Sequence, residues 1–491
     1  MDLTIRSAQI LFLKTLFTLI YPAENSGKNR LAPKRNSKRL FIARVSRLSV
    51  FRFLRERRDA MSLETAFDHT DRPSKKIIQD CVHCGFCLSS CPTYLETGNE
   101  LDSPRGRIHL IKAAEEGRIP MGESLVKHLD LCLGCLACET ACPSGVKYGS
   151  LIEMSRGQIE RRFKRGLGKK ILKAFIFKIF PYPQRLKVLL PFVYLVKTLG
   201  LKRVFPPWLL DRISLSASSM FHMLPEVNSA FGETLSAFYP AIGERKKKVA
   251  LLSGCVQRVF FPEINRATIE VLRASGCEVF VPKNQGCCGA LSVHSGRLEE
   301  GREFARKLVA LFATLNVDAV VVNSAGCGST MKEYAEILHE DPVYSEAAAQ
   351  LSAKTVDVME FLSDVEIEAS LRPLDIKITY QDACHIVHGQ GIRSAPRELL
   401  RSIPGVELVE MQRSDHCCGS AGIYNIVQPE MSAKLLSGKV SEIEKTGADY
   451  LAVGNPGCMI QIRKGLLGLD SKTKIVHPVE ILNWSLRGNI N

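Results

Sequence analysis

Two copies of one cysteine phrase constrain the fold of this 491-residue chain more than any other feature. They are CVHCGFCLSSCP at Cys81–Pro92 and CLGCLACETACP at Cys132–Pro143, and each runs Cys-x-x-Cys-x-x-Cys-x-x-x-Cys-Pro. Three thiols separated by two residues each can bind the same side of one metal centre, whereas the fourth is too far along the chain and can bind a second centre. We therefore expect the backbone around both phrases to fold about bound metal.

The spacing resembles the one by which bacterial ferredoxins hold [4Fe–4S] clusters, where the distant fourth thiolate ligates the other cluster. The resemblance implies two clusters with crosswise ligands. The first would be held by Cys81, Cys84, Cys87 and Cys142, and the second by Cys132, Cys135, Cys138 and Cys91. The alternative is zinc, whose structural sites use paired Cys-x-x-Cys clips. Zinc needs neither the third cysteine nor the trailing proline, so we favour clusters and expect electron transfer.

The cysteine content indicates a reducing compartment. Seventeen cysteines would suggest disulfides in a small secreted protein, but this chain is large and shows no cleavable secretory signal, so its clustered thiols indicate metal. No stretch reaches the 18 or more apolar residues of a membrane-spanning helix. We expect a cytoplasmic protein without a transmembrane helix, with peripheral contact at the inner face of the cytoplasmic membrane as a further option.

The first sixty residues carry most of the net charge of +15, with 14 Lys and Arg against 4 Asp and Glu. The remainder is nearly balanced, so nucleic-acid binding is not expected. An Arg-rich, acid-poor segment is also typical of a mitochondrial transit peptide. A start codon placed before the true one at Met61 is the simpler explanation, and disorder or a membrane-surface arm are the others.

Composition and motifs divide the chain into five segments. We expect a basic extension over 1–60, a ferredoxin-like domain over 61–157, a variable helical linker over 158–246, and two cysteine-rich repeats over 247–368 and 369–491. The linker has no cysteine and interleaves Lys with bulky apolar residues. It could lie on a membrane surface or pack as helices between domains.

Between the two cysteine phrases, Ser103–Ile119 has the apolar spacing of a helix, and Asp102 or Ser103 would cap it before Pro104. Arg105 and Arg107 on this helix could face the clusters, whose net charge is negative. They could equally be solvated on the helix surface.

The last half of the chain is an internal repeat of about 130 residues. In the first copy Cys255, Cys287, Cys288 and Cys327 match the second copy's Cys384, Cys417, Cys418 and Cys458. Each cysteine or cysteine pair follows a short apolar run of strand character, and helical patterns lie between the runs. Alternating strands and helices predict a parallel α/β sheet, whose strand ends bring the cysteines of one copy together.

A four-cysteine layout that occurs twice indicates a redox or metal site in each copy, and buried structural thiols are the alternative. The glycine after each cysteine pair would let the backbone close on a bulky group. His385, His388 and His416 lie beside these cysteines. Each could be a ligand, a proton relay or a hydrogen-bonded structural residue, so no catalytic residue is assigned.

The repeat resembles the cysteine-rich CCG domain of heterodisulfide reductases. The whole order, together with the phrases ELDSPRGRIHLIK, GCCGA, CCGSAG and HPVE, resembles the glycolate oxidase iron–sulfur subunit family. The resemblance implies an α+β multidomain fold, with a mostly helical bis-[4Fe–4S] domain before a tandem α/β region with parallel strands. Thr330 and Gln461 stand where the fuller repeat has a fifth cysteine. Each repeat could therefore hold an ordinary cluster, another metal or no metal.

We therefore expect an electron-transfer subunit of a flavin-linked glycolate dehydrogenase. No G-x-G-x-x-G phrase opens a βαβ unit, so FAD is expected on partner dehydrogenase subunits, and a quinone or another carrier would accept the electrons. The alternatives are the corresponding subunit for lactate or glycerol-3-phosphate, or a thiol–disulfide reductase acting through the repeats. An oxygen-sensing regulator is disfavoured, because no nucleic-acid motif is present.

Overall fold

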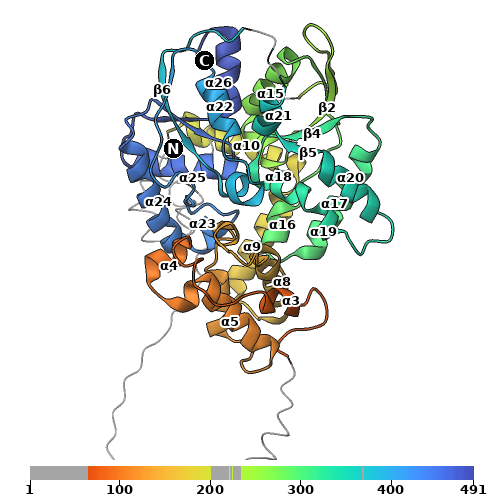
Figure 1. Ribbon diagram of the computed structural model, residues 1–491, viewed down its shortest axis with the longest axis vertical. Coiled ribbons are helices and arrows are strands. Elements are labelled where there is room, and N and C mark those ends of the chain that lie inside the picture. Colours follow the sequence, from red (N-terminus) through yellow and green to blue (C-terminus); the bar gives the residue numbers. More distant parts are fainter. Residues whose placement is uncertain are drawn as a thin grey trace, which may run out of the picture.

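The computed structural model describes residues 65–200, 221, 224, 234–365, 367 and 370–490. The extension predicted over 1–60 and part of the predicted linker lie outside these residues. A helical module carrying both cysteine phrases lies at one end of the molecule, and two α/β lobes lie at the other (Figure 1). The predicted fold class is confirmed.

The helical module is built from short helices joined by the cysteine loops. They are α3 (Lys75–Gln79), α4 (Pro92–Thr97), η1 (Glu100–Asp102), α5 (Pro104–Glu115), α6 (Glu123–Asp130), α7 (Ala137–Thr140) and α8 (Tyr148–Arg162). The hydroxyl of Ser103 accepts a hydrogen bond from the Gly106 N–H at 2.9 Å, so Ser103 caps α5. Helix α8 continues past the boundary expected at residue 157.

The first lobe contains a five-stranded sheet in the order β1-β3-β2-β4-β5, parallel except for the β1–β3 pair. Its strands are β1 (Phe238–Tyr239), β2 (Lys247–Leu252), β3 (Cys277–Phe280), β4 (Ala319–Val322) and β5 (Thr355–Asp357). Its helices are α14 (Val256–Phe260), α15 (Pro262–Ala274), α16 (Ala290–His294), α17 (Leu298–Ala313), α18 (Ala325–Lys332), α19 (Tyr334–Ile337), α20 (Ser345–Lys354) and α21 (Val358–Ser363).

The second lobe repeats this pattern with an all-parallel sheet in the order β7-β6-β8-β9. Its strands are β6 (Ile376–Gln381), β7 (Val406–Leu408), β8 (Tyr450–Val453) and β9 (Lys474–Val476). Its helices are η2 (His385–Gly389), α22 (Ala395–Arg401), α23 (Tyr424–Val427), α24 (Pro429–Glu444), α25 (Pro456–Gly468) and α26 (Pro478–Arg487).

The two lobes share one apolar core. Val249 and Leu251 of β2 belong to the same buried cluster as Ile378 and Tyr380 of β6. Strands buried on both faces read as continuous apolar runs, which explains why β2, β4 and β8 could be recognised in the sequence. The lobes therefore hold their cysteine-bearing strand ends in a fixed relation to each other.

Two helices of the predicted linker, α9 (Leu167–Ile179) and α10 (Pro183–Thr198), pack against the lobes. Ile176 and Phe177 are buried against Ile423 and Ile426 of the second lobe. These helices also carry exposed apolar side chains, namely Leu167, Ile171, Phe175, Val188, Phe192 and Leu195. No helix in the described ranges is both long and apolar enough to cross a membrane.

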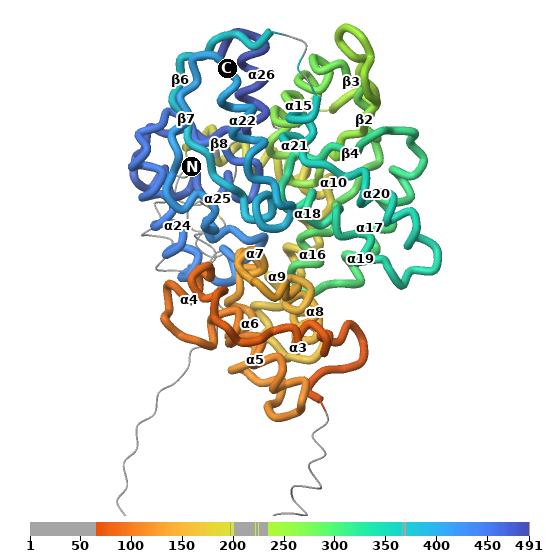
Figure 2. The backbone as a smooth tube through the Cα atoms, viewed as in Figure 1, coloured from red at the N-terminus to blue at the C-terminus, as the bar shows by residue number. Residues whose placement is uncertain are grey.

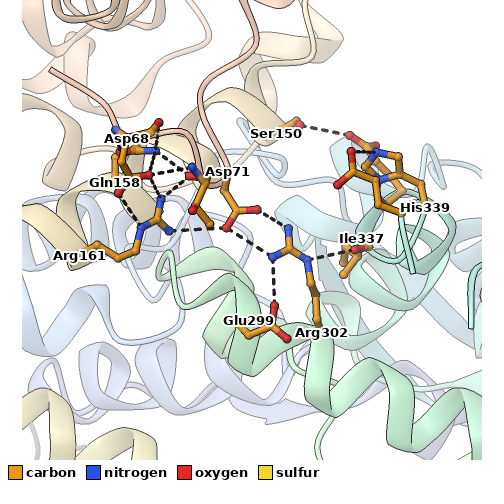
Figure 3. A network of polar contacts seen from close by, with 12 residues as sticks. Asp68, Asp71, Ser150, Gln158, Arg161, Glu299, Arg302, Ile337 and His339 are labelled. Carbon is orange, nitrogen blue, oxygen red and sulfur yellow. Dashed lines mark hydrogen bonds and ion pairs between the residues drawn. The ribbon is translucent and has the colours of Figure 1, made fainter. Parts of the chain in front are cut away.

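Ion pairs join the helical module to the first lobe (Figure 3). Arg302 of α17 pairs with Asp71, which also lies 3.6 Å from Arg161 of α8, and Arg161 contacts Asp68 at 3.0 Å. The module lies below both lobes, with α4 near α24 and α8 near α16 (Figure 2). Both lobes therefore contact the module, the second lobe at α4 and the first at α8.

Candidate metal centres

The structure gathers Cys81, Cys84, Cys87 and Cys142 around one hollow, whose lining Cys138 also reaches. Three of these thiols come from the loop before α4, and the fourth ends the second phrase. Val82 and Phe86 beside them are 67% and 66% exposed, so this hollow lies at the surface. Burial raises the pKa of Cys87 to about 11, against the backbone N–H groups that favour its thiolate.

A second hollow is lined by Cys91, Cys132, Cys135 and Cys138. The fourth thiol of the first phrase thus faces the three closely spaced thiols of the second phrase. Cys91, Cys132 and Cys138 are buried, so this hollow lies deeper in the molecule than the first. The two hollows share Cys138 and Tyr148 in their linings, so the two sets of thiols adjoin each other.

Donors surround the sulfur atoms of the second set. The Tyr148 hydroxyl lies 3.6 Å and the Gly134 N–H 3.4 Å from the Cys132 sulfur. Burial disfavours the Cys132 thiolate, but Arg107 and Arg156 outweigh burial and hold the pKa of Cys132 below its usual value. The surroundings therefore favour the Cys132 thiolate, the form that a metal ligand requires, whereas burial raises the pKa of Cys135 and Cys138.

The thiols of both sets stand around a hollow, as the ligands of a cluster do. No three or more Cys, His, Asp or Glu side chains in the described ranges lie close enough together to bind one metal ion. A cubane of four irons and four sulfides is wider than one ion, so thiolates that hold it must stand around a hollow. The eight thiols around the two hollows, with Cys138 reaching the lining of both, form such a donor set.

In the first lobe the four cysteines lie at the carboxyl ends of three neighbouring parallel strands. Cys255 follows β2, Cys287 and Cys288 follow β3, and Cys327 lies at the start of α18 after β4. The sulfur atoms of Cys255 and Cys287 are 3.6 Å apart. Hydrogen bonds from Cys255 and Cys288 lower the pKa of Cys287 despite its burial.

The second lobe places its cysteines in the same way. Cys384 follows β6, Cys417 and Cys418 follow β7, and Cys458 lies in the first turn of α25 after β8. Hydrogen bonds from Cys417 and Cys458 lower the pKa of Cys418 despite its burial. The strand-end convergence expected from the repeat is therefore present in both lobes.

The glycine after each cysteine pair is required by the backbone. Gly289 has φ +84° and Gly419 has φ +82°, and the N–H of each lies 3.4 Å from the sulfur of Cys287 or Cys417. A Cβ on Gly419 would meet the Ser432 carbonyl oxygen at 2.7 Å. The left-handed turn thus lets a backbone N–H face a thiol, where a side chain would prevent it.

The positions that lack a fifth cysteine hold buried, hydrogen-bonded polar residues. Thr330 lies 3.3 Å from Nε2 of His294, and Gln461 donates to the Ser432 hydroxyl at 2.8 Å. Each site therefore has four cysteines, and a hydrogen-bonded Thr330 or Gln461 occupies the position of the fifth.

The cysteines of the second lobe lie directly against the second set of the helical module. Cys384 and Cys417 pack in one apolar cluster with Leu133 and Cys135. The hydroxyl of Tyr424 donates to the Leu131 carbonyl at 3.0 Å and ties α23 to the same loop. The first lobe's cysteines belong to a separate buried cluster.

Two of the three histidines named from the sequence join the second lobe to the module. Nε2 of His385 donates to the Gly134 carbonyl at 3.0 Å, and Nδ1 of His388 lies 2.9 Å from the Thr140 hydroxyl. His416 is half-buried, and burial lowers its pKa. These contacts hold the second lobe against the module, and the second ring nitrogen of each histidine, Nδ1 of His385 and Nε2 of His388, is buried without a hydrogen-bond partner in the described structure.

A polar junction between the module and the lobes was not predicted from the sequence. Nδ1 of His294 lies 2.6 Å from the Glu153 carboxylate, and the His294 ring meets the His385 ring edge-on at 4.7 Å. Arg156 donates to the carbonyl oxygens of both His294 and Cys132. Only the fold brings these residues together, and no local pattern marks them.

Comparisons with known proteins agree with this arrangement. Residues 77–146 match a family model described as a 4Fe-4S dicluster domain, and residues 249–332 and 378–463 each match one described as a cysteine-rich domain. The probable glycolate oxidase iron–sulfur subunit of Bacillus subtilis (strain 168) is 40% identical over 424 residues, which cover 84% of this chain and 95% of that protein. The chain belongs to the glycolate oxidase iron–sulfur subunit family.

Other relatives vary in how much of this subunit they match. The glycolate oxidase iron–sulfur subunit of Escherichia coli (strain K12) is 32% identical over 413 residues, covering 84% of this chain and 94% of that protein. Lactate utilization protein A of Geobacillus kaustophilus (strain HTA426) is 34% identical over 237 residues, or 48% of this chain and 98% of that protein. The iron–sulfur interpretation of the phrases is confirmed at the level of the family.

Proposed function

We propose that this chain is the electron-transfer subunit of a flavin-linked glycolate dehydrogenase complex. Two [4Fe–4S] clusters would be held crosswise, one by Cys81, Cys84, Cys87 and Cys142 and one by Cys132, Cys135, Cys138 and Cys91. The observation that carries the proposal is the grouping of these eight thiols around two adjoining hollows. A bound cluster of this kind takes up and releases one electron at a time.

The substrate chemistry is assigned to a partner. Glycolate loses two electrons and two protons as its C–OH group becomes the carbonyl of glyoxylate. FAD on a partner subunit would accept both electrons and pass them one at a time to this chain. A quinone or another two-electron carrier would then accept the electrons from this chain. A quinone would also take up two protons. This division is supported by the matching subunits of other glycolate oxidases, which are named as iron–sulfur subunits of a larger enzyme.

The position of the two cysteine sets supports a direction for electron transfer. The first set is the more exposed, with Cys84 at the surface between Val82 and Phe86, and suits docking of the flavin-bearing partner. The second set is buried and adjoins Cys384 and Cys417 of the second lobe. We place electron exit in the lobes, where four thiols per lobe could hold a further redox-active metal site.

Contact with a membrane surface would suit a quinone acceptor. The exposed apolar residues of α9 and α10 are interleaved with lysines, a pattern that favours the surface of an anionic bilayer. The subunit would then be a peripheral protein.

The test is the activity of the purified complex with glycolate, lactate and glycerol-3-phosphate as alternative substrates. We expect the highest kcat/KM with glycolate, and no oxidation of glycolate by this chain alone. Lactate is the second candidate, because half of the chain matches lactate utilization proteins. Disulfide reduction by the isolated chain at enzyme-like rates would instead support a thiol–disulfide reductase and overturn the proposal.

A further inference from the structure

Arg107 carries a buried positive charge beside the second set of cysteines. It comes from α5, is 1% exposed, and lines the hollow formed by Cys91, Cys132, Cys135 and Cys138. Its Nε donates to the His128 carbonyl at 2.7 Å and its Nη2 to the Thr93 hydroxyl at 2.9 Å. Its remaining nitrogen, Nη1, lies 3.9 Å from the Cys91 sulfur.

No ion pair joins this guanidinium to an Asp or Glu side chain among the residues that the structure describes. The Asp102 carboxylate acts on it only through space, and Oδ1 of Asp102 lies 2.7 Å from Nδ1 of His128. A buried charge without a paired opposite charge is costly, because the low-dielectric interior does not replace the lost hydration. Cys91 and Cys132 line the same hollow and also act on Arg107, so as thiolates they would add to its counter-charge.

We infer that Arg107 is a positioning residue that supplies the counter-charge of the second cluster and holds its reduction potential above that of the first. A [4Fe–4S] cluster with four thiolate ligands is negatively charged, and reduction adds another negative charge. A nearby cation stabilises the reduced form more than the oxidised form. Because the site is buried, solvent and salt screen this attraction little.

Arg105 provides the contrast at the first cysteine set. It lines the first hollow, but its side chain is 31% exposed and its Nε lies 2.8 Å from the Glu100 carboxylate. Its Nη1 donates to the His83 carbonyl at 3.0 Å. A charge that is paired and partly solvated acts weakly on its surroundings. The two arginines, two residues apart on one helix, would thus make electron transfer from the first cluster to the second favourable.

The inference rests on the proposed two-cluster function, and the test uses the full chain prepared anaerobically. Reduction potentials are measured by titration followed by electron paramagnetic resonance in wild type, Arg107→Gln, Arg107→Lys and the matched control Arg105→Gln. We expect Arg107→Gln to lower the potential of one cluster by about 59 mV or more, a tenfold change in the one-electron equilibrium. Arg107→Lys keeps the positive charge, so its cluster potential should stay close to the wild-type value. Arg105→Gln should leave the potential of that cluster unchanged.

Iron content decides the case in which a variant loses a cluster. Loss of the cluster in Arg107→Gln together with its retention in Arg107→Lys supports the inference, because the two variants differ in the positive charge. Unchanged potentials in an Arg107→Gln chain that keeps both clusters would overturn it, as would equal loss in both variants. A wild-type chain without iron would overturn the proposed function itself, so the two failures are distinguishable.

Discussion

The thiol of Cys135, in the second cysteine phrase, packs in one apolar cluster with the thiol of Cys384, which follows β6 in the second lobe. Burial and the neighbouring Cys384 thiol raise the pKa of Cys135. The ferredoxin-type module and the second lobe thus meet at their cysteines. No apolar cluster in the described ranges joins the module to the first lobe's cysteines in this way. The two repeats are alike in layout but differ in their position relative to the module.

Replacement of Cys135 by Ala should remove one of two reduced-state paramagnetic signals and leave the chain mostly folded. The thiol is one of four around the second hollow, and its removal would leave one iron of the cubane without a protein ligand. Cys277→Ala is the matched control, because Cys277 is buried in β3 away from either hollow and should keep both signals. Stoichiometric zinc in anaerobically prepared protein would contradict the assignment.

Replacement of Cys418 by Ser should abolish electron delivery to the acceptor while the clusters of the module remain reducible. Cys418 has the lowered pKa among the second lobe's cysteines, and this lobe adjoins the module. The measurement is acceptor reduction by the complex together with dithionite reduction of the module. Cys288→Ser tests the first lobe in parallel, and unchanged turnover in both variants would mean that these thiols are structural.

Gly419→Ala should destabilise the protein by about 1–3 kcal/mol, because a non-glycine residue at φ +82° is strained and its Cβ would clash with the Ser432 carbonyl oxygen. Gly438→Ala, in the exposed middle of α24 with open space around it, should stabilise by about 0.5–1 kcal/mol. Urea unfolding midpoints measure both. Effects of the same sign in the two variants would contradict the backbone argument.

The buried His477 should make stability depend on pH. Burial lowers its pKa to about 3, so below its ordinary pKa of about 6.5 the unfolded chain binds a proton that the folded chain does not. The contribution of His477 to the free energy of unfolding is therefore complete above about pH 6.5. Below that pH it falls by about 1.4 kcal/mol per pH unit.

The comparison variant is His477→Asn, which keeps an acceptor for the N–H of Val479 at the start of α26. Glu480 faces the same turn, and its pKa, raised by burial to about 7, gives the opposite trend in both proteins. The difference between wild type and variant isolates the histidine. Between about pH 7 and about pH 5.5, the urea midpoint of the wild type should fall more than that of His477→Asn. An equal change of the midpoint in both proteins would refute the assignment.

Much of the fold could be predicted from local patterns. The apolar runs before Cys255, Cys327, Cys384 and Cys458 became β2, β4, β6 and β8, because central parallel strands are buried on both faces. The three-residue strands β5 and β9 and the antiparallel β1 were not predicted. Strands this short carry little periodicity, and their pairing depends on neighbours far away in the sequence.

The sequence by itself determined the cysteine phrases, the two repeats and hence the family, because ligand spacing and strand–helix alternation are properties of contiguous residues. Tertiary structure decided what surrounds the thiols. Arg105 and Arg107 could not be distinguished in the sequence, yet packing leaves one paired at the surface and buries the other beside four thiols. Burial and the choice of charge partner arise only when distant segments pack together, and these two quantities set the electrostatics of a redox site.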